Sequence, residues 1–475
     1  MRRWLTLAAA LLLVAYFVRM SLATLHVTFA RDDMMNIAYY WHLPPWQALL
    51  GPLMPWKTLY RPLGGWLLLP ILRIFGLNPV AFRVGMLVFL LANVFLIRRL
   101  CQLLGTGERA AWLVALIACY HVGLSNLYFN IPFVFDVLCG FFFVAALLYY
   151  VSLRQRDVVP NWRQVVAFLA LYLAALDAKE MAVTLPAALL LYEWFYHPPL
   201  PWSGRALLAW LRGPGRSVVA AGCLTLVCLA GRVLGKGGLA HDPGYQIKLS
   251  MARVWTFQLQ SFGDLFEKWE YFGRAGVAAI WIALFYFAWR RPRPVLRFAV
   301  LCLLVTPLPI EFLIGRAGAC LYIPMVAWAI LVSVLFVDAA DAISRVLVHE
   351  PGFRRLGPPA RLSAVMVAAG ALFWAYQNAD LKRRYLDPAT HDWAPETWSV
   401  IQQLKAIAPP VRPHSTVVFL DDPMGNWDML FIAELHFRDR TVVIRLNRKT
   451  PLTPDEIAKA DYLFDCVDGR LVRVR

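Results

Sequence analysis

The feature that most constrains this chain is a series of apolar stretches, each near twenty residues long, separated by short connections rich in arginine. A transmembrane helix needs a run of this length because the hydrocarbon core of a bilayer is about 30 Å thick. The chain is 60% hydrophobic and only 16% charged, which is too little polar sequence to cover a soluble protein of this size. We therefore predict a polytopic integral membrane protein.

The apolar stretches define an all-α membrane region. They cover residues 4–22, 81–97, 110–128, 131–151, 164–177, 181–196, 217–234, 274–289, 297–314, 322–337 and 362–378. If Arg2 and Arg3 lie on the inner side, the arginine-bearing connections on that side are 98–109, 152–163, 197–216, 290–296 and 338–361. This agreement with the positive-inside rule predicts eleven transmembrane helices and a chain that ends on the outer side.

Two outer segments differ from ordinary connections. The first outer loop, residues 23–80, is rich in tryptophan, tyrosine and proline, which suits short helices that lie in the headgroup layer. After residue 380 the chain becomes charged and carries strand-like runs at 415–420, 441–446 and 462–467. We predict a membrane domain at 1–379, with a candidate lid loop at 235–273, and a small outer α/β domain at 380–475.

The net charge of +17 raises the question of a nucleic-acid partner. The cations, however, cluster at the ends of apolar stretches, as in Arg98-Arg99 and Arg290–Arg293. This distribution is typical of inner loops that face anionic lipid headgroups. We see no stripe of basic and aromatic residues and predict no nucleic-acid partner. The eight cysteines contain no CxxC pair, so neither a zinc site nor a disulfide framework is expected.

Asp32 and Asp33 are the only acidic residues before Glu108, and they follow the first predicted span on the outer side. Two adjacent carboxylates repel each other, which raises the pKa of one and favours a general base or a cation site. The alternative is that both merely mark the end of a helix in water. The residues alone leave both interpretations open, and they are our candidate catalytic residues.

The remaining unusual polar residues also gather at the outer ends of predicted spans. The candidate substrate-binding residues are Arg61, His121, Asp136, Lys179, Glu180, Arg316 and Tyr322. An arginine in an aromatic loop can hold a phosphate at the headgroup level, and an intramembrane carboxylate must face a cavity or a partner. Lipid contacts, interfacial ion pairs and helix packing are the alternatives. The convergence on one face predicts a site at the outer interface.

Several cations and a carboxylate in the headgroup layer suit the transfer of a sugar from a polyprenyl-phosphate lipid. The carboxylate would deprotonate an acceptor hydroxyl, and arginine or lysine would neutralise the phosphate that leaves. A transporter or flippase for a lipid-linked sugar is one alternative, although it would need ionisable groups deep in several spans and an internal repeat. A non-catalytic partner in envelope polysaccharide assembly is another, and it would tolerate loss of Asp32 and Asp33.

The order of the motifs resembles the GT-C superfamily of membrane glycosyltransferases. The nearest likeness is to the protein O-mannosyltransferases, especially the transmembrane branch with tetratricopeptide repeats. It extends over residues 25–325 and rests on Phe29–Asp33, Tyr60–Leu63, Phe75–Pro79, His121–Asp136, Ala178–Glu180 with Leu185-Pro186, and Arg316 with Leu321–Pro324. The resemblance implies an inverting glycosyltransferase with a polyprenyl-phosphate-linked donor, in which Asp32 or Asp33 acts on the acceptor hydroxyl. We favour Asp32 as the base.

The chain also departs from that family. Asn126 stands where the family has a glutamate, and the α/β tail replaces the tetratricopeptide repeats. The acceptor, a protein or a glycan, therefore stays open. Metal use varies within the superfamily, so a divalent cation is left open and no other cofactor is expected. We place the protein in a bacterial inner membrane, with membrane lipids as partners and the C-terminal domain in the periplasm.

Overall fold

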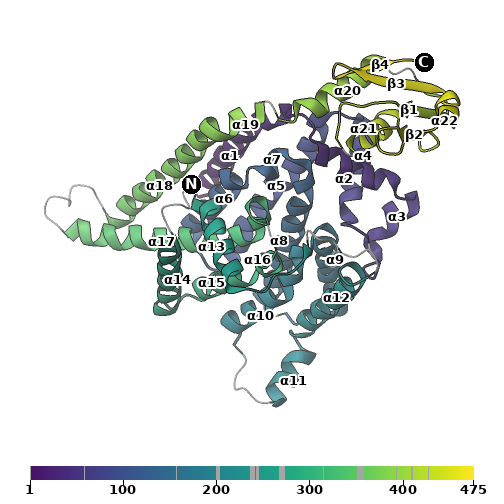
Figure 1. Cartoon of the computed structure of the whole chain (residues 1–475). Coiled ribbons are helices and arrows are strands. Elements are labelled where there is room, and N and C mark those ends of the chain that lie inside the picture. Colours follow the sequence, from purple (N-terminus) through teal and green to yellow (C-terminus); the bar gives the residue numbers. More distant parts are fainter. Residues whose placement is uncertain are drawn as a thin grey trace.

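The computed structural model describes residues 2–57, 59–156, 158–198, 204–235, 241, 245–266, 273–313, 315–349, 358–391, 393–407, 410–425 and 427–475. Most of these residues are helical, and a small sheet lies at one end of the helical bundle (Figure 1). Parts of the predicted lid loop, residues 236–240, 242–244 and 267–272, lie outside the described residues.

Six described segments are long and apolar enough to cross a bilayer: Arg3–His26, Pro79–Leu103, Ile131–Arg154, Pro294–Glu311, Gly318–Val348 and Pro359–His391. Helices α11 (Gly204–Arg212) and α12 (Arg216–Arg232), bent by 75° at their junction, make a seventh if counted as one span. The predicted polytopic helical membrane protein is thereby confirmed. The count of eleven stays a prediction, because the other predicted spans fall on helices outside this set: α6 (Glu108–Cys119), α9 (Trp162–Ala178), α10 (Leu185–Tyr196) and α14 (Gly273–Arg290).

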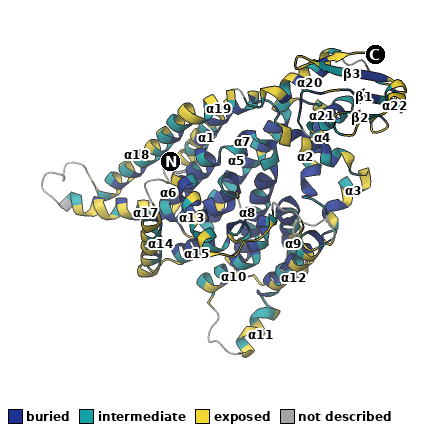
Figure 2. Ribbon diagram, viewed as in Figure 1, coloured by how far each residue is buried: buried dark blue, intermediate teal, exposed yellow. Residues whose placement is uncertain are grey.

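The core of the bundle lies between α5 (Pro79–Leu103), α8 (Val134–Arg154) and α17 (Tyr322–His349), as the burial colours of Figure 2 show. In the apolar window of the span that contains α17, 83% of the residues are buried, against 11% for the span that contains α18 (Pro359–Leu381). α18 therefore presents most of its surface outward, as a lipid-facing helix does. Helices α8 and α17 meet at Gly140, where an added Cβ would lie 2.5 Å from the ring of Tyr322.

Local sequence explains where several helices begin. The side chain of Asn78 accepts a hydrogen bond from the N–H of Val80 and caps α5, and Pro79 occupies the first helical turn. Asn161 and Gln164 form a reciprocal capping box at the start of α9. The remaining helices of the membrane part are α1 (Arg2–Ser21), α2 (Arg31–His42), α3 (Pro45–Leu50), α4 (Leu63–Phe75), α7 (Asn126–Phe129), α13 (Met251–Phe266), α15 (Pro294–Val305) and α16 (Leu308–Glu311).

The C-terminal residues form a four-stranded sheet in the order β2-β1-β3-β4. Strands β2 (Val443–Leu446) and β3 (Tyr462–Val467) both run parallel to the central β1 (Thr416–Phe419), and β4 (Arg470–Arg473) pairs antiparallel with β3. The three predicted strands are confirmed, whereas β4 was not predicted. Helices α19 (Asp387–His391), α20 (Pro395–Ile407), α21 (Asp428–Phe437) and α22 (Pro454–Ala458) complete this region. The boundary between the two domains stays a prediction.

The C-terminal region packs against α2, the helix that begins beside Asp32 and Asp33. At the far end of α2, a ring nitrogen of His42 lies 2.8 Å from Glu434 Oε2 in α21. At its start, Arg31 pairs with Glu396 at 2.7 Å and lies 3.7 Å from Asp428. Helix α2 is thus held between the membrane helices and the C-terminal helices α20 and α21, so its position depends on both (Figure 1).

Candidate active site

The two adjacent aspartates occupy different environments at the start of α2. Asp33 is fully buried, and its carboxylate accepts hydrogen bonds from the backbone N–H of Ala30 at 2.8 Å and of Ile131 at 3.1 Å. Asp32 is exposed, and no side-chain partner is present for it in the described part of the chain. Burial raises the pKa of Asp33 to about 7, although both N–H groups and Arg83 oppose this rise. Asp33 caps the helix, and Asp32 remains available to another molecule.

Arg83 is a buried residue that the sequence analysis did not select. Its guanidinium donates to the carbonyl oxygens of Phe129 at 2.9 Å, Thr28 at 2.9 Å and Pro79 at 3.2 Å. These bonds fasten the segment before α2 to the loop after α7, the same loop that bonds Asp33. The sequence feature that could have identified Arg83 is its position as a lone cation near the start of an otherwise apolar stretch. A buried arginine at such a position must find oxygen partners.

Lys179 and Asp136 form a buried ion pair beside the Asp33 contact. Lys179 Nζ lies 2.6 and 2.7 Å from the two carboxylate oxygens of Asp136 and 3.3 Å from Cys320 Sγ. An ammonium has three donors, so this lysine has none left for a ligand. The pair joins α8 to the connection between α9 and α10 and neutralises both charges within the protein.

Arg61 is held rigidly in the first outer loop. One guanidinium nitrogen donates to Glu180 Oε2 at 3.1 Å and to the Tyr245 hydroxyl at 3.0 Å. Its backbone has a left-handed φ of 43°, unusual for arginine, and its carbonyl accepts a bond from Tyr40 at 2.8 Å. Burial raises the pKa of Glu180, but Arg61, a backbone N–H and Lys179 together outweigh burial and leave this pKa below its ordinary value. A strained backbone fixed by several contacts is typical of functional positions.

Arg316 extends the same cluster through Tyr245. Its guanidinium lies 4.8 Å from the centre of the Tyr245 ring, whose hydroxyl is bonded to Arg61. Among the described residues, no carboxylate or carbonyl oxygen binds the Arg316 guanidinium, which is partly exposed. Lys248 N donates to Phe312 O at 3.0 Å, which fixes the segment of Tyr245 beside the loop of Arg316. Arg316 therefore offers its donors to an incoming anion.

One short segment links the aspartates to the cation cluster. Ile131 contacts Asp33, and Asp136 lies five residues later, at the start of α8. Because these residues are helical, the two positions are about 8–10 Å apart along the backbone. Phe135 lies between them, with the Arg61 guanidinium 5.1 Å from the centre of its ring. The structure thus brings Asp33, Asp136, Lys179, Glu180, Arg61 and Arg316 into one region. Lys179, Arg61 and Arg316 are cationic, and Asp136 and Glu180 are anionic. This group therefore has a surplus positive charge.

Two candidate binding residues have structural contacts instead. The ring of His121 is buried. Its Nε2 lies 3.0 Å from the carbonyl oxygen of Leu265, and its Nδ1 accepts a hydrogen bond from Gly123 N. These bonds anchor the end of α13. The Tyr322 hydroxyl accepts from Asn93 at 2.8 Å in the core between α5 and α17. Both side chains hold helices together in the structure, and neither joins the cluster around Arg61.

The divalent cation left open above stays open. Within the ranges that the structure describes, no three His, Cys, Asp or Glu side chains are arranged so that they could hold a metal ion. Among the described residues of the candidate site, Asp32 has the only carboxylate without a hydrogen-bond partner, and a protein site for Mg²⁺ or Ca²⁺ commonly uses several oxygens.

Comparison with solved structures identifies the fold. The chain matches the crystal structure of ArnT from Cupriavidus metallidurans bound to undecaprenyl phosphate with a TM-score of 0.52 and 16% sequence identity, over 99% of this chain and 97% of that one. The apo state of the same protein matches with a TM-score of 0.49 and 14% identity, over 98% and 93% of the two chains. No protein-family model matches the sequence, and no curated protein does. The chain therefore shares the fold of ArnT over nearly its whole length, which agrees with the GT-C resemblance of its motifs.

Proposed function

We propose that this protein is an inverting glycosyltransferase of a bacterial inner membrane. It moves a monosaccharide from a polyprenyl-phosphate carrier to an acceptor hydroxyl at the outer face. The observation that carries this proposal is the exposed carboxylate of Asp32, which has no side-chain partner among the described residues. It adjoins Asp33, whose bond to Ile131 N links it to the region of Arg61 and Arg316. The crystal structure of ArnT with undecaprenyl phosphate supports a polyprenyl phosphate as the carrier.

In this mechanism Asp32 accepts the proton of the acceptor hydroxyl as its oxygen attacks the anomeric carbon. The new carbon–oxygen bond forms on the face opposite the phosphate, and the bond between the anomeric carbon and the phosphate oxygen breaks. The electron pair of that bond leaves on the polyprenyl phosphate. Arg316, with Arg61 behind it, stabilises the developing negative charge. The configuration at the anomeric carbon is inverted, and polyprenyl phosphate is the second product.

We infer supporting roles for the other residues of the site from their buried contacts. Asp33 and Arg83 fix the start of α2, and therefore the place of Asp32. Glu180 and Tyr245 hold Arg61 in one orientation, and the guanidinium of Arg316 lies over the ring of Tyr245. Such fixed dipoles and charges need little rearrangement during the reaction, which is how preorganised sites lower a barrier.

The direct test is transfer of radiolabelled sugar from a panel of polyprenyl-phosphate monosaccharides by purified protein in liposomes. We expect release of free polyprenyl phosphate and appearance of label on an acceptor or on water, with inverted anomeric configuration. Binding of every donor without release of polyprenyl phosphate, together with movement of the donor between leaflets, would contradict transfer. That result would favour the transporter.

Replacement of Arg316 tests the phosphate role separately from the base. A charge-assisted hydrogen bond contributes about 1.5–3 kcal/mol, so Arg316→Ala should weaken donor binding by about 10- to 150-fold. Arg316→Lys should retain part of this affinity, because it keeps the charge and loses the bidentate geometry. Arg470→Ala, at an exposed position of β4, is the matched control and should leave donor affinity unchanged. Equal affinities of wild type and Arg316→Ala would remove Arg316 from the donor site.

Buried ion pairs are the one observation that favours the transporter. Arg154 pairs with Glu193 at 2.7 Å, and Arg232 pairs with Asp177, all four side chains being buried. Ionisable groups of this kind line many transport pathways. In each pair, however, the two charges neutralise each other within the protein, whereas Asp32 and Arg316 are accessible to a substrate. The transfer reaction therefore remains the function that the site supports best.

A further inference from the structure

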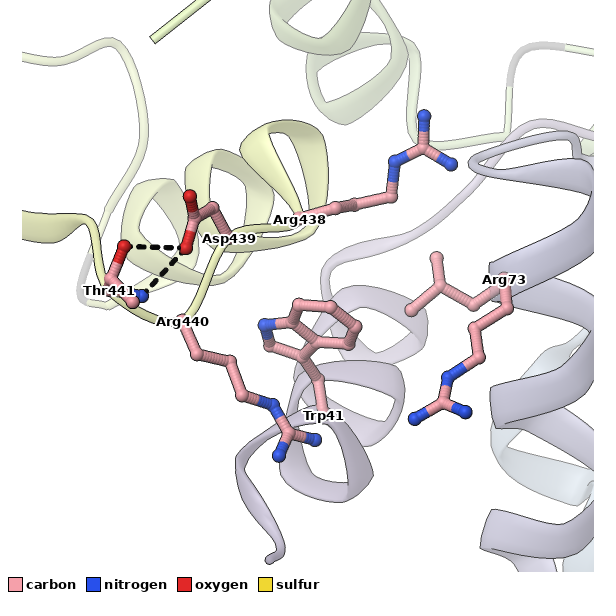
Figure 3. Close-up of a pocket in the computed structure, with 7 residues that line it drawn as sticks. Trp41, Arg73, Arg438, Asp439, Arg440 and Thr441 are labelled. Carbon is pink, nitrogen blue, oxygen red and sulfur yellow. Dashed lines mark hydrogen bonds between the residues drawn. The ribbon is translucent and has the colours of Figure 1, made fainter. Parts of the chain in front are cut away.

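A second charged cleft lies between the C-terminal region and the membrane helices, away from Asp32. We call it the arginine cleft; it has a volume of about 590 Å³ and is lined by Trp41, Leu72, Arg73, Arg438, Asp439, Arg440 and Thr441. Trp41 comes from α2, Leu72 and Arg73 come from α4, and Arg438 to Thr441 follow α21 (Figure 3). Trp41 lies nine residues after Asp32 on α2, which places it about 14 Å along the helix from that carboxylate.

The three arginines of the cleft have no neutralising partner in the described structure. Figure 3 shows Arg73 and Arg440 on two sides of Trp41, whereas the guanidinium of Arg438 points away from the indole. Asp439, the only acid in the lining, points to Thr441 and accepts its N–H at 2.8 Å and its hydroxyl at 2.7 Å. Burial and the neighbouring Arg73 both lower the pKa of Arg440, which shows that the like charges repel.

The backbone nevertheless holds these charges together. Arg438 ends α21 with a left-handed φ of 54°, and the facing Gly76 has a φ of 60°. A Cβ at Gly76 would lie 3.3 Å from Arg438 Nη1, so the two segments meet closely. Arg440 lies 5.0 Å from the centre of the Trp41 ring. Since like charges gathered without a counterion are unfavourable, this arrangement fits a site that an anion completes.

The surroundings of the cleft indicate the level at which it lies. Helix α4 has 13 residues and is apolar but too short to span a bilayer. Directly after Arg73, the side chains of Ile74 and Phe75 are 72% and 56% exposed. Apolar side chains this exposed, next to cations and a tryptophan, are typical of a helix lying in the headgroup layer. The mouth of the cleft therefore adjoins the acyl boundary.

We propose that the arginine cleft binds the phosphate headgroup of an anionic phospholipid from the outer leaflet. The phosphate lies between Arg73 of the membrane part and Arg440 of the C-terminal region, with Arg438 lining the same cleft, and the acyl chains extend along Ile74 and Phe75. Guanidinium groups suit phosphate oxygens because their paired N–H donors match them bidentately. The lipid thus joins the C-terminal region to the membrane surface and helps to fix α2, which carries Asp32. This site does not depend on the proposed transfer reaction.

The test uses the full chain in nanodiscs of phosphatidylcholine that contain 10% phosphatidylglycerol, with native mass spectrometry after detergent release. We expect wild type to retain a phosphatidylglycerol molecule. In the triple variant Arg73→Gln, Arg438→Gln, Arg440→Gln, the fraction of protein that carries this lipid should be at least about tenfold lower. A control with the same loss of charge, Arg445→Gln, Arg470→Gln, Arg473→Gln, alters the same region outside the cleft and should retain the lipid. Size-exclusion profiles and thermal unfolding confirm that both variants are folded.

A second arm separates the lipid from soluble phosphate. Phenylglyoxal modification of Arg73, Arg438 and Arg440 is followed by peptide mass spectrometry in detergent, with phosphatidylglycerol or with inorganic phosphate added. Protection by micromolar phosphatidylglycerol, but only by far higher inorganic phosphate, would support the proposal. Equal protection by inorganic phosphate, or equal lipid retention by the cleft and control variants, would overturn it. If the folded triple variant instead kept its lipid, the headgroup would bind elsewhere.

Discussion

Asp32→Asn is expected to lower the rate of sugar transfer by at least about a hundredfold, because a positioned general base contributes about 10²–10⁴-fold. Asparagine has nearly the same shape as aspartate but cannot accept the acceptor's proton. Asp32 is exposed and its carboxylate has no hydrogen-bond partner among the described residues, so the substitution should leave the fold and the binding of donor intact. The measurement is single-turnover release of polyprenyl phosphate, with donor affinity determined separately.

Asp33→Asn is the matched control, because it makes the same chemical change one residue away. The pKa of Asp33, raised by burial to about 7, would by itself suit a general base. Its geometry argues otherwise, since Ala30 N and Ile131 N occupy its oxygens and the residue is fully buried. Asp33→Asn replaces one acceptor oxygen by a donor and leaves a backbone N–H unpaired, which should cost about 1–3 kcal/mol of stability.

The two aspartate variants should therefore differ in kind. Asp32→Asn should show wild-type thermal unfolding and almost no transfer, whereas Asp33→Asn should unfold earlier and retain activity at low temperature. If Asp33→Asn were the inactive and stable variant, the base would be Asp33 and the start of α2 would have to open during the reaction. Full activity in both variants would contradict the glycosyltransferase proposal and favour the assembly partner.

How far the sequence predicts this site can be judged from its residues. The pair Asp32-Asp33 was selected because two acids at the outer end of a span are unusual, but sequence cannot say which one is buried. That depends on Ile131, which lies 98 positions away and donates to Asp33 only after folding. The same holds for Tyr245, which was considered only as part of a lid loop and in the structure joins Arg61 to Arg316.

The fold, like the site, was predicted from the sequence only in part. Apolar stretches predict where membrane helices lie because their length and composition must match the bilayer. They do not decide between spans and shorter buried helices such as α6, whose 12 residues pack within the bundle. Strands β1 to β3 carry runs of apolar residues and were predicted, whereas β4 reads Arg-Leu-Val-Arg and pairs only at the edge of the sheet. A strand of four residues with an arginine at each end carries little apolar signal.

The second large effect is expected at the buried pair of Lys179 and Asp136. Lys179→Met should lower the free energy of unfolding by about 3–5 kcal/mol, because it leaves the Asp136 carboxylate buried without a counterion. The double variant Lys179→Met, Asp136→Leu should recover most of this loss, since replacing both charges by apolar groups is often neutral. A double-mutant cycle measures this. Wild type, Lys179→Met, Asp136→Leu and the double variant are compared by thermal and denaturant unfolding in one detergent.

The exposed pair of Arg445 and Glu456, 2.8 Å apart on the C-terminal region, is the control, and Arg445→Gln should change stability by no more than about 1 kcal/mol. The cycle also separates two roles for Lys179. If this lysine held the donor phosphate, Lys179→Met would weaken donor binding while leaving the protein stable. The three contacts of its ammonium predict the opposite, a loss of stability that Asp136→Leu reverses. In that case the phosphate is left to the guanidinium groups, and Lys179 acts by fixing the start of α8 beside Asp33.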